Sequence, residues 1–373
     1  MSHDLELWEK IVGVKPAKFR KFGNFRYAYI VVIILMISNG VLTQEQTVLA
    51  PDLTEQNLHQ FIQFNYTPEY VQGYDNARDI LYSDIDNLNG IITGVYSGYS
   101  INLVGSYCDC ENGNDECSVL ADINDCQNSN GVWEIETDPS VEAYYKGINV
   151  ENTWPQSWGA GSGNPRADMH HLFPTKANVN SSRGEDPFDE IDDELTHKWY
   201  RHDEILLNIP DENIDEYAEK FNPVDQPELE TFEPREEQKG NTARAMFYFY
   251  AIYNDVAPEE FWNVQKSTLL EWHYDDPVDD TEFDRTFAIA GYQDELPNPF
   301  VLDSTLARRI WFYSEQSTNT QVMFQQAQLT VEEGSGEIII PVEIINHSEN
   351  SSTGCTISIL SSTANYEDID FTD

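Results

Sequence analysis

Apolar residues recur every three or four positions in the segment that follows Asp75, and this spacing is typical of a helix with one buried face. The apolar stripe runs from Ala77 to Leu88 and ends at Gly90, a residue at which helices commonly stop. Residues 91–96 then have the β-branched and aromatic composition of a strand. The pattern therefore predicts a helix capped by Asp75, with a strand directly after it.

Two more helices are predicted in the second half of the chain. One begins near Asn241, and the other covers residues 258–272 and ends before Pro277. Aromatic and aliphatic side chains recur at helical spacing in both. Because helices and strands do not alternate strictly, we expect an α+β domain, which we place at residues 45–315.

The composition changes after about residue 325. Short β-type runs at 329–331, 338–345 and 356–360 are separated by glycine, serine and asparagine, and no helical period is present. These runs are too few to close a β-sandwich core. We therefore expect a linker at 316–325 and a truncated β-sandwich segment at 326–373.

The N-terminus combines a basic arm with an apolar run at residues 27–42. The basic residues that precede the run are Lys10, Lys15, Lys18, Arg20, Lys21 and Arg26. This order predicts a signal peptide within residues 1–44. An N-terminal membrane anchor through residues 27–42 is the alternative, although the run is slightly short for a span. In either case we expect the remainder to be secreted, periplasmic or at the cell surface.

The charge balance bears on which partners the chain can bind. The chain has 66 acidic and 21 basic residues, for a net charge of -45, which repels nucleic acid at long range and is typical of a protein adapted to a salty medium. Because salt screens this field beyond about 8 Å, a local basic patch can still bind phosphate. Basic residues concentrate between residues 141 and 250, where such a patch is expected.

The cysteines are clustered. Four of the five fall in an apparent surface insertion at residues 107–131, namely Cys108, Cys110, Cys117 and Cys126. In an exported protein they predict two disulfides, in one of three pairings. A zinc site is the alternative, and the lack of a paired C-x-x-C arrangement disfavours it. Cys355 stands alone.

Residues that carry chemistry gather in three neighbouring segments, namely Gly147–Trp158, Asp168–Pro174 and Asn178–Arg183. In these segments the chain resembles the endonuclease I family of bacterial extracellular nucleases. Further segments in the family's order extend the resemblance over roughly residues 65–315: Tyr74–Tyr82, Phe232–Arg235, Lys239–Arg244 and Leu269–Val278.

The resemblance implies a ββα-metal (His-Me finger) fold, in which glutamate and asparagine hold one Mg²⁺ or Ca²⁺ and histidine deprotonates the attacking water. Matched residue by residue, Glu151 and Asn180 are the implied metal ligands. Oxygen ligands suit a hard cation, which can neutralise charge in the transition state. The implied activity is nonspecific, metal-dependent hydrolysis of DNA, with RNA as a second possible substrate and no stable protein partner.

The chain departs from the family pattern at Asn152, where histidine is expected. A carboxamide can orient water but cannot accept its proton, and losing a general base commonly costs about 10²–10⁴ in rate. Three interpretations stay open: an inactive relative that keeps the fold, a weak enzyme that uses bulk hydroxide or a neighbour such as His170 or His171, and a sequence error or single-codon variant of an active enzyme. The alternative function is a nuclease-fold binding or surface protein.

Other residues near the motif have two interpretations each. Arg183 can contact a phosphate or leaving group, or form a surface salt bridge. His170 and His171 can orient the site or have a structural role, and Asp168 can cap the segment that follows it.

The C-terminal residues resemble a second family. Leu329–Gly336 with Ile338–Val342 is similar to the opening of a Calx-beta domain, and Asn365–Phe371 to its middle acidic segment. This resemblance implies a β-sandwich that binds structural Ca²⁺ through Glu332, Glu333, Asp368 and Asp370. The alternative is a spacer with solvated acids. Because later strands of that family are missing, we expect the chain to be a fragment of a longer surface protein.

Overall fold

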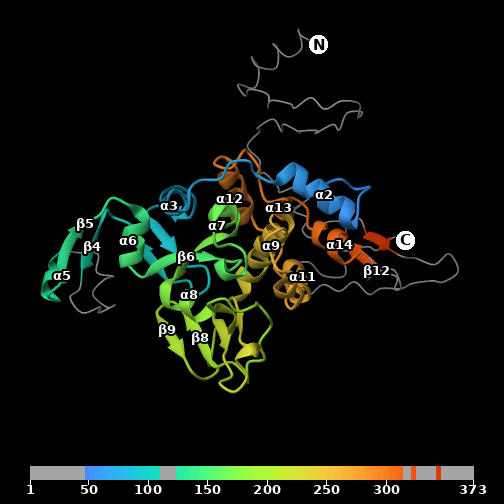
Figure 1. Cartoon of the computed structure of the whole chain (residues 1–373). Coiled ribbons are helices and arrows are strands. Elements are labelled where there is room, and N and C mark those ends of the chain that lie inside the picture. The colour runs from blue at the N-terminus through green and yellow to red at the C-terminus, as the bar shows by residue number, and fades with distance from the viewer. Residues whose placement is uncertain (1–46, 110–122, 314–320, 325–341, 346–373) are drawn as a thin grey trace, which may run out of the picture. The chain divides into compact units, whose positions relative to one another are not determined.

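The computed structural model describes four stretches of the chain, residues 47–109, 123–313, 321–324 and 342–345 (Figure 1). Several predictions concern residues outside these stretches: the leader at 1–44, the cysteines Cys110, Cys117 and Cys355, and the carboxylates of Glu332, Glu333, Asp368 and Asp370. Within the four stretches, no helix combines the length and apolar character that crossing a lipid bilayer requires.

The first part of the described chain consists of short helices and two small antiparallel sheets. Its elements are α2 (Glu55–Tyr66), α3 (Tyr74–Ile80), the π-helical turn η1 (Leu81–Ile85), β1 (Asn87–Leu88), β2 (Ile91–Thr93), β3 (Ser100–Asn102), β4 (Ser106–Asp109), α5 (Ile123–Asn128), β5 (Val132–Ile135) and α6 (Pro139–Tyr145). Strands β1, β2 and β3 form one sheet, and β4 pairs with β5.

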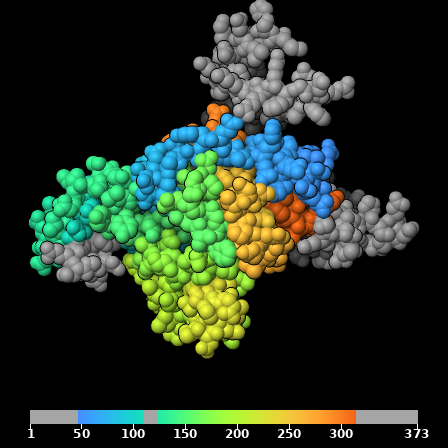
Figure 2. Space-filling model, viewed as in Figure 1, coloured from blue at the N-terminus to red at the C-terminus, as the bar shows by residue number. Residues whose placement is uncertain are grey.

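The middle part contains a hairpin, a helix that follows it and a four-stranded sheet. Its elements are β6 (Ile148–Asn152), η2 (Gln156–Trp158), α7 (Gly163–Ala167), η3 (Met169–His171), β7 (Leu172–Lys176), α8 (Ala177–Arg183), β8 (Lys198–Arg201), β9 (Glu204–Leu206), η4 (Ile214–Glu216), β10 (Ala218–Phe221), η5 (Pro227–Leu229) and β11 (Thr231–Glu233). The sheet is antiparallel, in the order β11-β10-β8-β9. Figure 2 shows green residues of this part at the surface, between the blue N-terminal helices and the yellow-green sheet.

The last part is mainly helical. Its elements are α9 (Glu236–Ile252), α10 (Glu259–Asn263), α11 (Lys266–Asp275), α12 (Asp280–Ala290), α13 (Pro299–Leu302), α14 (Leu306–Trp311), β12 (Gln321–Phe324) and β13 (Val342–Ile345). Figure 1 shows α9 beside α11, with which it is in extensive contact. Helices and antiparallel strands are mixed along the chain without regular alternation, so the predicted α+β class is confirmed.

Helix α9 is the centre of the main hydrophobic core. Most of its residues are buried, and Trp154, which follows β6, stacks on Phe249 with the ring centroids 4.9 Å apart. The edge of Phe261 meets the same indole at 5.2 Å. Burying an aromatic side chain contributes about 1.5–3 kcal/mol, so this stack holds the end of β6 firmly against the helical layer.

Several predicted helix boundaries were wrong. Helix α3 begins at Tyr74 after the N-cap Gly73, so Asp75 lies in the first turn and is not the cap. The helical run ends at Ile85 and Leu88 lies in β1, so Gly90 does not close the helix. Helix α9 begins at Glu236, earlier than Asn241. The helix predicted at 258–272 is two helices, α10 and α11.

The break between α10 and α11 lies at the buried residue Gln265. Its side chain donates to the carbonyl of Phe261 at 2.6 Å and accepts from the amide of Phe188 at 3.1 Å. The side chain therefore supplies hydrogen bonds to backbone groups at the interruption and ties this region to the segment after α8.

A disulfide joins Cys108 in β4 to Cys126 in α5. The described part of the expected insertion contributes to a β4–β5 ribbon and to helix α5, which the disulfide joins to it. These two sulfurs are covalently paired and are not thiolate ligands for zinc.

At the C-terminal end, β12 and β13 pair antiparallel. Strand β13 lies within the run predicted as a strand at 338–345, whereas β12 lies within the segment expected to be a linker at 316–325. The rest of the segment that resembles Calx-beta lies outside the described residues.

Replacing Gly240 by alanine should destabilise the fold, because the added Cβ would lie 1.9 Å from the carbonyl oxygen of Asp276. We expect the free energy of unfolding to fall by about 1–3 kcal/mol, the usual cost of overpacking. Urea denaturation followed by tryptophan fluorescence measures this change. Gly73→Ala is the matched control, since nothing lies within 4 Å of the Cβ it would add. Equal stability of the two variants would contradict the described contact.

Candidate metal centre

The hairpin of β6 and β7 and the helix α8 form a ββα unit. The strands pair antiparallel, with Glu151 opposite Phe173 and Asn152 opposite Leu172. Helix α8 begins directly after β7 and packs on both strands. The sequence between the strands forms η2, α7 and η3, so the two strands are adjacent although they are well separated along the chain.

Glu151 is a buried carboxylate, with only 2% of its surface exposed. Its Oε1 accepts a hydrogen bond from the hydroxyl of Tyr96 at 3.1 Å and lies 3.3 Å from Nη1 of Arg183. Burial raises the pKa of Glu151 to about 7, although the charge of Arg183 and the hydrogen bond from Tyr96 both lower it. The carboxylate is thus ionised above neutral pH and protonates readily below it.

Arg183 ends α8 and is fully buried, so the surface salt bridge considered above is not what the structure contains. Besides Glu151, its guanidinium donates to the carbonyls of Thr153 at 2.8 Å and Gly184 at 3.2 Å. Its central carbon lies 4.5 Å from the centroid of the Phe188 ring. These contacts hold the cation against the Glu151 carboxylate.

Asn180 lies one turn before Arg183 on the same helix, so both face β6. Its Nδ2 donates to Oδ1 of Asn149 at 2.9 Å and to the carbonyl of Val150 at 3.0 Å. Because Val150 directly precedes Glu151, the structure brings the two implied metal ligands to one interface between β6 and α8.

The donor set at this interface fits a hard divalent cation. Within the described part of the chain, neither Oε2 of Glu151 nor Oδ1 of Asn180 has a hydrogen-bond donor. A carboxylate and a carboxamide oxygen are ligands of the kind that Mg²⁺ and Ca²⁺ prefer. Two protein ligands leave most coordination positions to water and a phosphate.

Asn152, at the position of the expected histidine, is held by three hydrogen bonds and is 7% exposed. Its Oδ1 accepts from the hydroxyl of Tyr74 at 3.0 Å and from Nε2 of Gln156 at 3.1 Å. Its Nδ2 donates to the carbonyl of Arg166 at 3.1 Å. Both lone pairs of the carboxamide oxygen are therefore engaged, and one N–H is left for water.

The two histidines of the motif are buried in the core. Nε2 of His170 lies 2.9 Å from the carbonyl of Leu296, and Nε2 of His171 lies 2.7 Å from that of Pro165. Burial lowers the pKa of His170 and lowers that of His171 to about 4. Among the described contacts of these rings, none reaches Glu151, Asn152 or Asn180, so the geometry favours the structural interpretation.

Asp168 caps η3 as predicted, by accepting from the amide of His170 at 3.0 Å. It also accepts hydrogen bonds from Tyr248 at 2.8 Å, from Tyr253 at 2.7 Å and from Gln293 at 2.8 Å. This buried carboxylate therefore joins η3, and through it β7, to α9 and the segment after α12. The sequence did not reveal these partners because they are distant along the chain.

Most basic residues between 141 and 250 are paired with carboxylates and do not form a free phosphate-binding patch. The paired residues are Lys146, Lys176, Arg183, Arg201, Lys220, Arg235, Lys239 and Arg244. Arg166 has no ion pair among the described residues and lies with its guanidinium carbon 4.1 Å from the centroid of the Tyr74 ring. Its charge is thus available beside Tyr74, the residue whose hydroxyl donates to Asn152.

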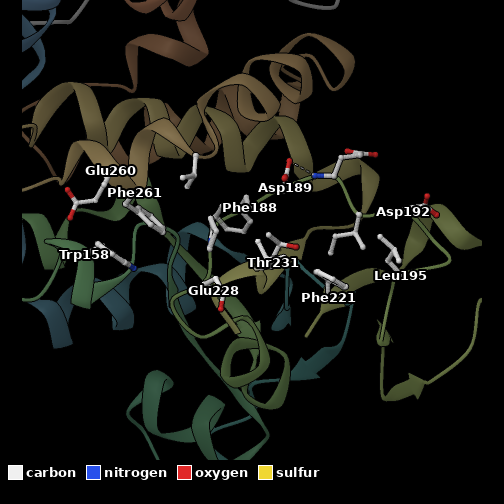
Figure 3. A pocket seen from close by; sticks show the side chains of 15 residues that line it. Trp158, Phe188, Asp189, Asp192, Leu195, Phe221, Glu228, Thr231, Glu260 and Phe261 are labelled. Carbon is white, nitrogen blue, oxygen red and sulfur yellow. Dashed lines mark hydrogen bonds between the residues drawn. The ribbon is translucent and has the colours of Figure 1, made fainter. Parts of the chain in front are cut away.

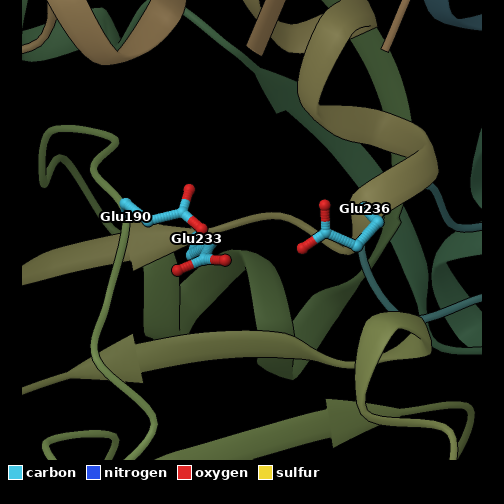
Figure 4. Close-up of side chains that lie close together, drawn as sticks. All are labelled: Glu190, Glu233 and Glu236. Atoms are coloured by element: carbon cyan, nitrogen blue, oxygen red, sulfur yellow. The ribbon is translucent and has the colours of Figure 1, made fainter. Parts of the chain in front are cut away.

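A second group of carboxylates lies away from this hairpin. Oxygens of Glu190, Glu233 and Glu236 lie within 4.8 Å of one another (Figure 4). Nζ of Lys239 already pairs with all three, at 3.0, 2.7 and 2.7 Å. The ammonium group occupies the role that a cation would have, so this cluster is an ion-pair network.

A cavity of about 580 Å³ lies between the four-stranded sheet and α10 (Figure 3). Its walls are largely apolar, with Phe188, Phe221 and Phe261 among them. Five carboxylates and no lysine or arginine line it: Asp189, Glu190, Asp192, Glu228 and Glu260. This charge does not fit a polyanionic strand.

Replacing Glu151 by glutamine should change stability in a pH-dependent way when no divalent metal is present. The folded pKa of about 7 exceeds the ordinary value of 4.5, so the folded state binds the proton more tightly. Proton binding to Glu151 therefore stabilises the folded wild type below pH 4.5. This contribution to the free energy of unfolding, about 3 kcal/mol, is lost as the pH rises through 7. The melting temperature of Glu151→Gln relative to wild type should rise between pH 5 and pH 8 in EDTA. A difference that is constant with pH would contradict the burial of this carboxylate. Other titrating groups are common to both proteins.

Comparison with known proteins finds relatives among extracellular ribonucleases. The chain is 30% identical over 210 residues to the extracellular ribonuclease of Bacillus subtilis (strain 168), covering 50% of this chain and 64% of that protein. It is 29% identical over 178 residues to the extracellular ribonuclease of Bacillus amyloliquefaciens, covering 44% and 53%. The chain thus spans less than two thirds of the length of either relative. The sequence profile of endonuclease I matches residues 76–305, more than half of the chain, which therefore belongs to the endonuclease I family.

Proposed function

We propose that this protein is an exported, metal-dependent nuclease that hydrolyses phosphodiester bonds, with Glu151 and Asn180 as ligands of one Mg²⁺ or Ca²⁺ ion. The observation that carries the proposal is the β6–α8 interface, to which a buried carboxylate and a carboxamide each bring one oxygen atom, Oε2 of Glu151 and Oδ1 of Asn180, that has no hydrogen-bond donor among the described residues. Export is supported by the basic and apolar leader and by the extracellular relatives.

RNA and DNA are both proposed as substrates. The two relatives are named ribonucleases, which favours RNA, whereas the family as a whole is named for endonuclease activity. Contacts directed at phosphate carry no base information and do not distinguish the two polymers. A distinction requires a group that contacts the ribose 2′-hydroxyl.

The ion, when bound, would neutralise negative charge that develops on the phosphate during hydrolysis. Arg183 offsets the charge of Glu151, so the protein site alone has little net negative charge. We therefore expect the ion to bind weakly without substrate and more tightly when a phosphate supplies further negative charge.

Arg166 is the cation that we assign to the substrate phosphate. Its backbone carbonyl holds Asn152, and no carboxylate of the described chain neutralises its side chain. Arg183, the residue first expected in this role, is enclosed by Glu151 and two carbonyls and instead balances the buried carboxylate.

Neither Asn152 nor Tyr74 can act as a general base for the attacking water. Asn152 can donate one N–H to a water but cannot take its proton. Burial raises the pKa of Tyr74, the nearest hydroxyl, so this group is a donor and not a base at neutral pH. The proposal is therefore a slow enzyme whose rate depends on hydroxide from the solvent and increases with pH.

Replacing Asn152 by histidine should accelerate cleavage of both RNA and supercoiled plasmid by about a hundredfold or more at pH 7. An imidazole can donate Nδ1–H to the carbonyl of Arg166 and leave Nε2 to accept a proton. The rate of the wild type should rise steadily from pH 6 to pH 9, whereas that of Asn152→His should level off above about pH 7. Gel assays with Mg²⁺, Ca²⁺ or EDTA measure these rates.

The double variant Asn152→His/Glu151→Gln is the control, and it should lose the gain because the metal ligand is removed. EDTA should abolish cleavage by every active form. Cleavage that persists in EDTA, or absence of cleavage in both wild type and Asn152→His, would contradict the proposed activity.

A nuclease-fold binding protein is the second candidate, and the three hydrogen bonds that hold Asn152 favour it. A carboxamide whose oxygen accepts two hydrogen bonds and whose nitrogen donates one suits a structural position. This candidate predicts that the wild type binds RNA without cutting it. Filter binding beside the cleavage assay separates the two.

A further inference from the structure

Asn149 and Asn180 are joined by a hydrogen bond that neither the ion nor the water chemistry requires. Asn149 lies two residues before Glu151 on β6, so both side chains project from the face of the hairpin that α8 covers. Of the two hydrogens on Nδ2 of Asn180, one goes to Oδ1 of Asn149 at 2.9 Å and the other to the carbonyl of Val150 at 3.0 Å.

These two acceptors determine which way the Asn180 carboxamide faces. A primary carboxamide has a donor end and an acceptor end of nearly equal size, so packing alone does not distinguish its two orientations. Turning it over would place Oδ1 against the carbonyl oxygen of Val150 and, with the Asn149 side chain as it stands, against a second oxygen atom, so both hydrogen bonds would be lost. With Val150 as the single acceptor, the second hydrogen of Nδ2 would have no protein partner, and the preference for one orientation would be weaker.

We propose that Asn149 is a positioning residue, which orients the Asn180 carboxamide so that Oδ1 is presented to the divalent ion. This inference rests on the proposed function, because it assigns a role within the same metal site. Asn149 is assigned this orienting role and not that of a ligand, because the one contact of its Oδ1 among the described residues is with Nδ2 of Asn180. Its contribution is to exclude the orientation in which a nitrogen would face the cation.

The test is the affinity of the full chain for Mn²⁺ alone, measured by titration with the EPR signal of the free ion as readout. We expect Asn149→Ala to weaken Mn²⁺ binding about fivefold, the effect of losing one hydrogen bond. Asn149→Asp keeps an oxygen acceptor for Nδ2 of Asn180, so it should restore the affinity. A side chain with a merely structural role would not show this rescue.

Asn178 provides matched controls, because it lies on the same helix α8 and is exposed. Asn178→Ala should leave Mn²⁺ affinity unchanged. Asn178→Asp adds the same charge as Asn149→Asp without an acceptor for Asn180, so it measures the purely electrostatic gain. Melting temperatures of all variants identify any that fail to fold.

The outcomes separate this inference from the proposed function. If Asn180→Ala and Glu151→Gln lose Mn²⁺ binding while Asn149→Ala keeps it, the positioning role is overturned and the metal site stands. The role is also overturned if folded Asn149→Ala and Asn149→Asp are equally weak, or if the Asn149→Asp rescue does not exceed the gain of Asn178→Asp. If Glu151→Gln and Asn180→Ala bind Mn²⁺ like wild type, the metal site itself is wrong.

Discussion

The ion pair between the buried carboxylate of Glu151 and the guanidinium of Arg183 is the contact on which the rest of the site depends. Burying a lone charge costs several kcal/mol, and a partner at 3.3 Å offsets part of that cost, while burial still raises the pKa of Glu151 to about 7. Because Arg183 ends α8, this pair also fixes where the helix lies on the hairpin. Asn180, one turn earlier on α8, is thereby held against β6 beside the carboxylate.

The helical layer supports this arrangement from the other side of the hairpin. Trp154 stacks on Phe249 of α9, and Asp168 accepts hydrogen bonds from the hydroxyls of Tyr248 in the same helix and of Tyr253 at its C-cap. Both contacts join segments that flank β6 and β7 to the core. In a strongly acidic chain most basic residues form ion pairs with carboxylates. The lysines and arginines near the motif therefore stabilise the fold more than they provide an open phosphate-binding surface.

Local pattern in the sequence predicted the class of the fold, the strand after Gly90 and the existence of the helices, because side-chain periodicity reports which face is buried. It misplaced the start of α9, because the apolar spacing used to find the helix begins at Ala243, whereas the first turn at Glu236 is polar in sequence. For the site, the resemblance pointed to Glu151 and Asn180. It could not supply Tyr96 as the partner of Glu151, because that contact depends on tertiary packing between residues distant in sequence.

The account's central claim is that one cation binds between Glu151 and Asn180, and a crystal soaked in Mn²⁺ tests it most directly. An anomalous difference map should place a single strong peak about 2.1–2.3 Å from a carboxylate oxygen of Glu151 and from Oδ1 of Asn180, within the usual range for hard cations. A strong peak at Glu190, Glu233 and Glu236 with none at the hairpin, or no bound ion at all, would contradict the account.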